Sequence, residues 1–302
     1  MYDNSDPRAR LSNSSSAAPA LQAFQPADCT RFYEAAPQIV EPARQTWLAR
    51  GQNAVISYST LQPGGSISRR DQKDEWALLI PERNTRARIS ASNCGEASEI
   101  AGHSLTFLPP GASDVSFPAG GRAVCIFTTA SDDLTALCPN DALYAQSLRT
   151  VPPYAPWPRP AMGDRIRSYS LDVPDEPGRF GRIWRCTTLM INCLTPQMGP
   201  RDPTKLSPHH HDDFEQYSLA LNGSFLHHLR WPWVPNMKMW RPDEHEFCGS
   251  PSVAVIPPPV IHTTQAVDSG PNLLVDIFAP PRMDFSVMPG WVLNNDDYPM
   301  PG

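Results

Sequence analysis

Proline constrains the fold of this chain more than any other residue, because it occurs 35 times among 302 residues. It lacks a backbone N–H and its ring clashes with the preceding helical turn, so helix interiors and central strands exclude it. A chain with so many prolines is expected to consist of many short elements joined by rigid turns. Apolar residues make up 40% and charged residues 19%, which is typical of a globular protein. The composition therefore predicts an all-β fold with few short helices.

Short apolar runs follow one another at the spacing of strands in a sandwich or barrel. The first series reads AVISYSTL (54–61), EWALLI (75–80), SLTFL (104–108) and AVCIFTTA (123–130). The second reads RIWRCTTLMINCL (182–194), EQYSLALNG (215–223), SFLHHLRW (224–231), SVAVI (252–256) and NLLVDIF (272–278). A helix is expected only near 30–50, before the first series.

A proline-rich stretch, VPPYAPWPRPAMGD at 151–164, separates the two series and is the predicted linker. We therefore expect one domain at 26–150 and a second at 165–302. Residues 1–25 are rich in Ser, Ala, Asn and Pro and have no hydrophobic periodicity, so we expect a mobile tail.

Two motifs occur in the same order in both halves. SRRDQKDEWALLI (68–80) aligns without a gap with PHHHDDFEQYSLA (208–220), which places Glu75 over Glu215. GHSLTFLPPGASD (102–114) aligns with GSPSVAVIPPPVIH (249–262) when a one-residue gap is allowed near the glycine. Such an internal repeat indicates a duplicated domain. The first half has Arg69, Asp71 and Asp114 where the second half has histidines.

Those histidines form a pattern typical of metal sites. His209 and His211 are two residues apart, so an extended chain aims both at one point while His210 faces away. Three residues separate Glu215 from His211. His262 follows the IPPP turn, with only Val260 and Ile261 between them. Imidazoles and a carboxylate with open positions suit Fe(II), Mn, Ni or Zn.

The two motifs of the second half resemble those of the cupins: a His-x-His pair followed by a carboxylate and a glycine, and then a glycine, a proline turn and a histidine. The resemblance implies two jelly-roll β-barrels in one chain, a bicupin, with a degenerate cupin domain at 26–150 and a metal-binding one at 165–302. It also implies that His209, His211, Glu215 and His262 hold one divalent ion in the barrel mouth, with Fe(II) favoured.

The identity of the fourth ligand depends on the strand register. The usual cupin spacing would place Gln216 at the ligand position. Strand alternation favours Glu215, because Tyr217, Leu219 and Leu221 would then face the barrel interior with it. The charge of a carboxylate would also offset that of the dication.

Further side chains are candidates for contact with a substrate. Tyr217 and His228 are predicted to be catalytic proton carriers. His228 with Arg230, or alternatively His227 alone, could face the barrel. Trp231 and Trp233 lie in a long insertion between the motifs and are predicted to bind substrate as an apolar lid.

The resemblance implies a mononuclear metal enzyme, and we favour a non-haem iron dioxygenase acting on a small hydroxy/carbonyl, possibly aromatic, substrate. One alternative is a redox-neutral isomerase or lyase of a sugar acid or another hydroxy-carbonyl compound. Another is a binding protein without catalytic activity, which retention of all the ligands in one half disfavours.

Charge and cysteine content narrow the expected partners and location. The net charge is -6 without a basic run, so we expect no nucleic-acid partner. No apolar run approaches the length of a membrane span, and residues 1–20 lack the apolar core of a signal peptide, so a cytoplasmic protein is expected. Seven cysteines without a CxxC pair indicate reduced thiols. The partner is therefore expected to be a small molecule, and a homodimer could form.

The sequence predicts one tightly bound divalent ion per chain, because Arg69, Asp71 and Asp114 supply no imidazole. Metal analysis of protein purified without a histidine tag measures this stoichiometry. Two equivalents of metal, or none after reconstitution, would contradict the prediction.

Overall fold

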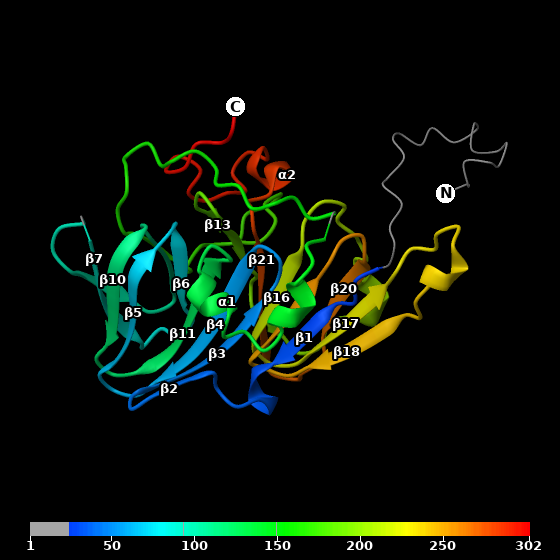
Figure 1. The fold of residues 1–302 in the computed structure, drawn as a ribbon, viewed down its shortest axis with the longest axis horizontal. Coiled ribbons are helices and arrows are strands. Elements are labelled where there is room, and N and C mark those ends of the chain that lie inside the picture. The colour runs from blue at the N-terminus through cyan, green and yellow to red at the C-terminus, as the bar shows by residue number, and fades with distance from the viewer. Residues whose placement is uncertain (1–23, 93, 149) are drawn as a thin grey trace.

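The computed structural model describes residues 24–302 except 93 and 149, so nearly all of the tail predicted at 1–25 lies outside the described residues. The described chain is mostly β (Figure 1). Its helical segments are short. They are α1 (Asp132–Thr135), α2 (Met283–Ser286) and the 3-10 turns η2 (Phe32–Glu34), η3 (Asp141–Tyr144), η4 (Pro203–Lys205) and η5 (Met237–Met239).

Two sheets form a barrel in the first half of the chain. A seven-stranded sheet in the order β12-β9-β6-β11-β4-β3-β2 packs on a four-stranded sheet in the order β5-β10-β7-β8. The strands are β2 (Ile39–Glu41), β3 (Arg44–Arg50), β4 (Ala54–Leu61), β5 (Gly65–Gln72), β6 (Trp76–Ile80), β7 (Arg86–Ala91), β8 (Ser98–Ala101), β9 (Ser104–Leu108), β10 (Gly111–Phe117), β11 (Gly121–Thr128) and β12 (Arg167–Ser170). The interior of this barrel is apolar and includes Trp76, Leu78 and Cys125.

The second half repeats this arrangement. A sheet in the order β1-β19-β16-β21-β14-β13, with β15 also paired to β21, accompanies a three-stranded sheet in the order β18-β17-β20. The strands are β1 (Asp28–Arg31), β13 (Ile183–Arg185), β14 (Met190–Cys193), β15 (Gln197–Met198), β16 (Gln216–Asn222), β17 (Phe225–Arg230), β18 (Glu244–Cys248), β19 (Ser252–Ile256), β20 (Ile261–Ala266) and β21 (Pro271–Phe278).

The predicted repeat is visible in the strand pairing. Strand β6 lies between β9 and β11, and β16 lies between β19 and β21 in the same antiparallel register. The equivalent Cα pairs are Trp76 with Leu108 and Gln216 with Ile256, then Ala77 with Ile126 and Tyr217 with Ile277. Position 76 in the first barrel therefore corresponds to position 216 in the second, as in the sequence alignment.

The two seven-stranded sheets pack against each other through a shared apolar core. This core contains Ile56 and Ile126 from the first half and Tyr217, Leu219 and Leu221 from β16 of the second, all nearly or fully buried. One face of β16 therefore points into the contact between the halves. Because side chains alternate along a strand, the other face of β16 points into its own barrel.

Each half also contributes a strand to the sheet of the other. Strand β1 pairs with β19, and β12 pairs with β9. In Figure 1 the blue β1 accordingly lies among the yellow and orange strands of the second half. Arg31 fixes this arrangement through an ion pair with Glu246 and two hydrogen bonds to the carbonyl oxygen of Phe247.

The helix predicted near 30–50 does not form. That segment contains η2, β2 and β3 instead, and β3 pairs with β4 along its whole length. Pro37 and Pro42 interrupt the segment, and neither can occupy a helix interior.

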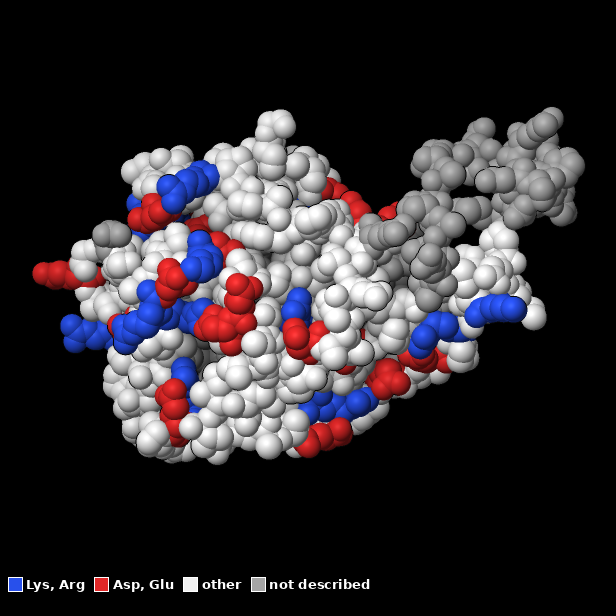
Figure 2. Space-filling view, viewed as in Figure 1, with Lys and Arg blue, Asp and Glu red and all other residues white. Residues whose placement is uncertain are grey.

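Acidic and basic side chains are interspersed on the face shown in Figure 2, without a continuous basic field. Within the part of the chain that the structure describes, no helix has the length and apolar character needed to cross a membrane.

The shared core predicts a large stability cost for truncating Leu219, which is 0% exposed. Leu219→Ala leaves a cavity between the sheets and should lower the free energy of unfolding by about 2–5 kcal/mol. The matched control is Val40→Ala, at a position that is 67% exposed, which should change it by less than about 0.5 kcal/mol. Urea denaturation of both variants measures this. Equal midpoints would contradict the assignment of the core.

Candidate metal centre

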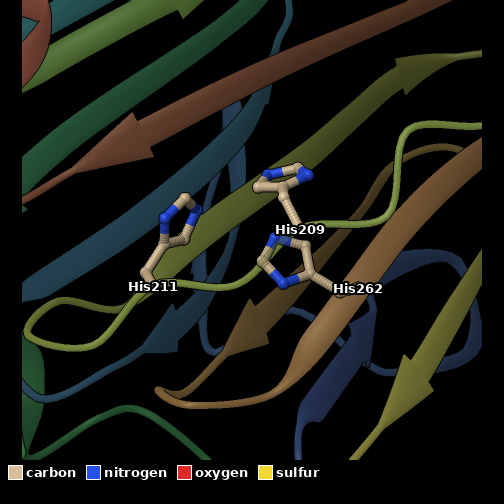
Figure 3. A group of neighbouring side chains, drawn as sticks. All are labelled: His209, His211 and His262. Atoms are coloured by element: carbon tan, nitrogen blue, oxygen red, sulfur yellow. The ribbon is translucent and has the colours of Figure 1, made fainter. Parts of the chain in front are cut away.

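Three histidines converge in the second barrel. One ligand atom each from His209, His211 and His262 lies within 4.8 Å of the others, and Figure 3 shows the three rings around a common space. Their ring centroids are 4.5–5.2 Å apart. His209 is exposed, whereas His211 and His262 are 9% and 2% exposed. The group is therefore anchored in the barrel and open to solvent on the side of His209.

The backbone explains why these rings meet. His209 and His262 exchange both backbone hydrogen bonds, at 3.0 and 2.7 Å, as a closely spaced antiparallel pair. His262 is the second residue of β20 and follows closely after the proline turn. His211 lies two residues after His209, so its side chain comes back to the same side.

Two carbonyl oxygens set the tautomers of this pair. Nδ1 of His209 lies 2.9 Å from the carbonyl oxygen of Ser207, and Nδ1 of His262 lies 2.9 Å from that of Val260. A carbonyl only accepts, so each Nδ1 carries the proton and each Nε2 keeps a free lone pair. This is the usual way in which proteins prepare imidazole as a metal ligand.

The fourth group at the cluster is the amide of Gln216. Its Oε1 lies 3.0 Å from Nε2 of His211 and 3.3 Å from Nε2 of His262. Its Nε2 donates to Ser218 Oγ at 3.0 Å and to Asp276 Oδ1 at 3.1 Å. Those acceptors orient the amide so that its oxygen faces the imidazoles.

This donor set fits a divalent cation. With its proton on Nδ1, His262 turns the Nε2 lone pair toward the Gln216 oxygen, so two acceptors face each other. Burial lowers the pKa of His262 to about 4 and, together with Arg282, that of His211 to about 3, so both rings are neutral near pH 7. A cation between these atoms would satisfy them, and neutral imidazole with an amide oxygen suits the intermediate divalent metals.

Glu215 does not belong to this group, which corrects the prediction from strand alternation. Its Oε2 accepts from the backbone N–H of Gln52 at 2.7 Å and from the Tyr217 hydroxyl at 3.0 Å, in the contact between the halves. The apolar face of β16 covers the other half rather than lining the barrel. Gln216, the alternative fourth ligand, faces the imidazoles instead.

The structure also places the predicted substrate-contact residues. Tyr217 is fully buried between the halves, and its hydroxyl accepts from the backbone N–H of Ala54 at 3.0 Å. His228 and Arg230 occupy the outer face of β17, where His228 contacts His245 and Arg230 pairs with Asp243. None of these side chains lies among the three imidazoles.

The two predicted lid residues differ from each other. Trp231 is buried and donates to the carbonyl oxygen of Gln25, and the Arg241 guanidinium lies 4.6 Å from the centre of its ring. Trp233 is 74% exposed and stacks on Trp240 with ring centroids 4.7 Å apart. Neither is in contact with the metal-binding group.

Sequence reasoning missed four side chains around the site, or ranked them low. His227 faces the interior from β17, with Nδ1 3.0 Å from the Thr264 hydroxyl. Phe214 stacks on His211 with centroids 4.3 Å apart, and Arg282 lies 4.7 Å from the centre of the Phe214 ring.

The remaining residue is Asp276 on β21, where burial raises the pKa of the carboxyl group. A charged residue inside the apolar run NLLVDIF was the available signal for it.

Comparison with known proteins defines the fold. No family model matches the chain, and no curated protein matches it. AerE from Microcystis aeruginosa superimposes with a TM-score of 0.54 at 9% identity, covering 81% of this chain and 96% of that one. Oxalate decarboxylase from Lactobacillus farciminis, solved as a formate complex, gives 0.53 at 15% identity, with 84% and 86% covered.

A third solved structure, from a study of the Mn(II) centres of Bacillus subtilis oxalate decarboxylase, gives a TM-score of 0.53 at 12% identity, with 90% and 83% covered. The similarity to these solved structures covers both halves of the chain. The chain has the bicupin fold. At these identities the similarity concerns the fold, so the chemistry of this bicupin must be argued from its own residues.

The first barrel has no equivalent of the histidine group among the residues described. Trp76 stands at the position of Gln216, is fully buried and stacks on Phe127 with centroids 5.0 Å apart. The first barrel therefore has an indole at the position where the second barrel has the Gln216 amide.

The fourth ligand can be tested by paired substitutions. Gln216→Leu should lower metal affinity by at least about 10-fold, because it removes the side-chain oxygen that faces Nε2 of His211 and His262. Glu215→Gln should retain the metal, because that side chain faces the other half. The metal content of the two variants after identical dialysis decides whether Gln216 or Glu215 is the fourth ligand. The opposite pattern would restore Glu215 as the ligand.

Proposed function

We propose that this bicupin is a mononuclear metal-dependent enzyme with its catalytic centre in the second barrel. The supporting observation is the convergence of His209, His211 and His262 with the Gln216 oxygen, two of the imidazoles having fixed tautomers. Fe(II) is the favoured ion from the ligand chemistry. Mn, which is named for a similar fold, is the second choice, followed by Ni and Zn.

A divalent ion at such a centre acts as a Lewis acid and, if it is iron, as a redox partner for O2. The protein's contribution is to hold the ligands, leave one side open and exclude water from the other. His209 marks the open side, and Phe214 and Phe278 cover His211. His227, buried on the inner face of β17, is the imidazole best placed to carry a proton for the reaction.

The ligand set indicates the charge of the substrate. Three neutral imidazoles and an amide leave both positive charges of a dication without an anionic ligand. The Arg282 guanidinium, enclosed by Phe214, Phe278 and Phe285, also lies near His211, but its charge is balanced by an ion pair with Asp284. A small anionic oxygen chelate, such as an enolate or a hydroxy-carboxylate, fits this electrostatic environment.

Two reactions suit such a substrate. Dioxygenation of a small, possibly aromatic, hydroxy-carbonyl compound is the first, because the ligands leave room for both a chelate and O2. A redox-neutral lyase or isomerase reaction on a small carboxylate is the second. The similarity of the fold to oxalate decarboxylases supports it. A non-catalytic binding role is the remaining alternative, and the prepared imidazoles argue against it.

Reconstitution tests the proposal. Metal-free protein is loaded with Fe(II) or Mn(II) and supplied with catechols, diketones, keto-sugars and oxalate, while O2 uptake and CO2 release are recorded. Stoichiometric O2 uptake identifies the dioxygenase. Turnover without O2 identifies the redox-neutral enzyme.

The controls for this experiment are histidine variants. His262→Ala should abolish both metal binding and turnover. His228→Ala should preserve both, because that imidazole lies on the outer face of β17. Equal loss in the two variants, or metal binding that survives His262→Ala, would refute the proposed centre.

A further inference from the structure

A directed chain of hydrogen bonds connects the candidate metal centre to the partly buried carboxylate of Asp276. Gln216 Nε2 donates to Ser218 Oγ at 3.0 Å, and Ser218 Oγ donates to Asp276 Oδ1 at 2.8 Å. Gln216 Nε2 also donates to Asp276 Oδ1 directly, at 3.1 Å. Both donors thus point toward the carboxylate, and the only Gln216 acceptor points toward the imidazoles.

Strand geometry fixes this chain in place. Ser218 on β16 and Asp276 on β21 are direct cross-strand partners, and Gln216 precedes Ser218 by two residues on the same face. Ser218 is 0% and Gln216 is 5% exposed. Among the residues that the structure describes, no Lys, Arg or His forms an ion pair with Asp276. The carboxylate is therefore held by hydrogen bonds and not by a direct ion pair with a described residue.

The first barrel provides an internal comparison. Its residues at the three equivalent positions are Trp76, Leu78 and Cys125, as the shared strand register shows. All three are apolar and fully buried in one core. The same strands can therefore close a barrel without any polar group at these positions. The three polar residues occur only in the half that holds the histidines.

We propose that Asp276 is a positioning residue of the metal centre, orienting the Gln216 oxygen toward the ion and supplying, one residue removed, the negative charge that the neutral ligands lack. This inference rests on the proposed metal-dependent function. In the usual cupin motif a ligand carboxylate carries this negative charge. Here the charge would instead come from a residue behind an amide ligand. Such outer partners commonly change metal affinity about 10- to 100-fold.

Asp276→Asn separates charge from geometry. The Asn oxygen can still accept from Ser218 and Gln216, so the amide stays oriented while the charge is lost. We expect Zn2+ and Co2+ affinity, measured by chelator competition, to fall roughly 10- to 100-fold. The urea midpoint of the metal-free protein should stay unchanged or rise, because a partly buried charge without an ion-pair partner is removed. A purely structural role predicts a lower midpoint and unchanged affinity.

A charge exchange provides the rescue. Gln216→Glu alone places two carboxylates in contact and should perturb the metal-free protein. Gln216→Glu combined with Asp276→Asn returns the net charge to that of the wild type, and the Asn amide can donate to the new carboxylate. The double variant should regain affinity to within about 3-fold of the wild type, which additive effects of the two changes would not produce. The visible spectrum of the Co2+-loaded protein reports whether the coordination geometry is restored.

Glu75→Gln is the matched control, because Glu75 is a buried carboxylate in the first half that accepts from Thr187 and Tyr298. It should leave metal affinity unchanged. If the wild type binds no metal, the proposed function fails and this inference fails with it. If the wild type binds metal and Asp276→Asn changes its affinity no more than Glu75→Gln does, the inference alone is overturned.

Discussion

The contact between the two seven-stranded sheets determines the orientation of every side chain on β16. The apolar face of that strand, with Tyr217, Leu219 and Leu221, is buried against the other half. Strand alternation then leaves Gln216 and Ser218 to face the barrel. The candidate metal centre thus depends on a hydrophobic surface on the opposite side of the same strand. Glu215, at the end of the buried face, is held by the Gln52 backbone and the Tyr217 hydroxyl.

Much of the fold and the histidine group followed from sequence, because both depend on local patterns. Apolar runs predicted strands such as AVISYSTL, which is β4 to the residue. In a His-x-His motif the two imidazoles face the same side whenever the backbone is extended, so their convergence needs no information from distant residues. The aligned motifs also gave the correct equivalence of positions 76 and 216.

The remaining assignments depended on long-range packing that no local pattern contains. An apolar strand face was interpreted as a barrel interior, although two sheets packed through their outer faces produce the same alternation. This interpretation places Glu215 instead of Gln216 beside the histidines. The same ambiguity affected β17, where His227 faces inward and His228 outward. The proposed role of Asp276 needed the register between β16 and β21, which joins residues 58 positions apart.

The exchange of β1 and β12 has a consequence for how the protein is made on the ribosome. Strand β1 is synthesised early, but its partner β19 begins with Ser252 and emerges more than two hundred residues later. During that interval the backbone groups of β1 have no strand partner, and a contact so distant in sequence forms slowly. The second barrel, which holds the histidine group, can be completed only when both ends of the chain are present. Among the strands that the structure describes, the first to be synthesised therefore belongs to the last sheet to close.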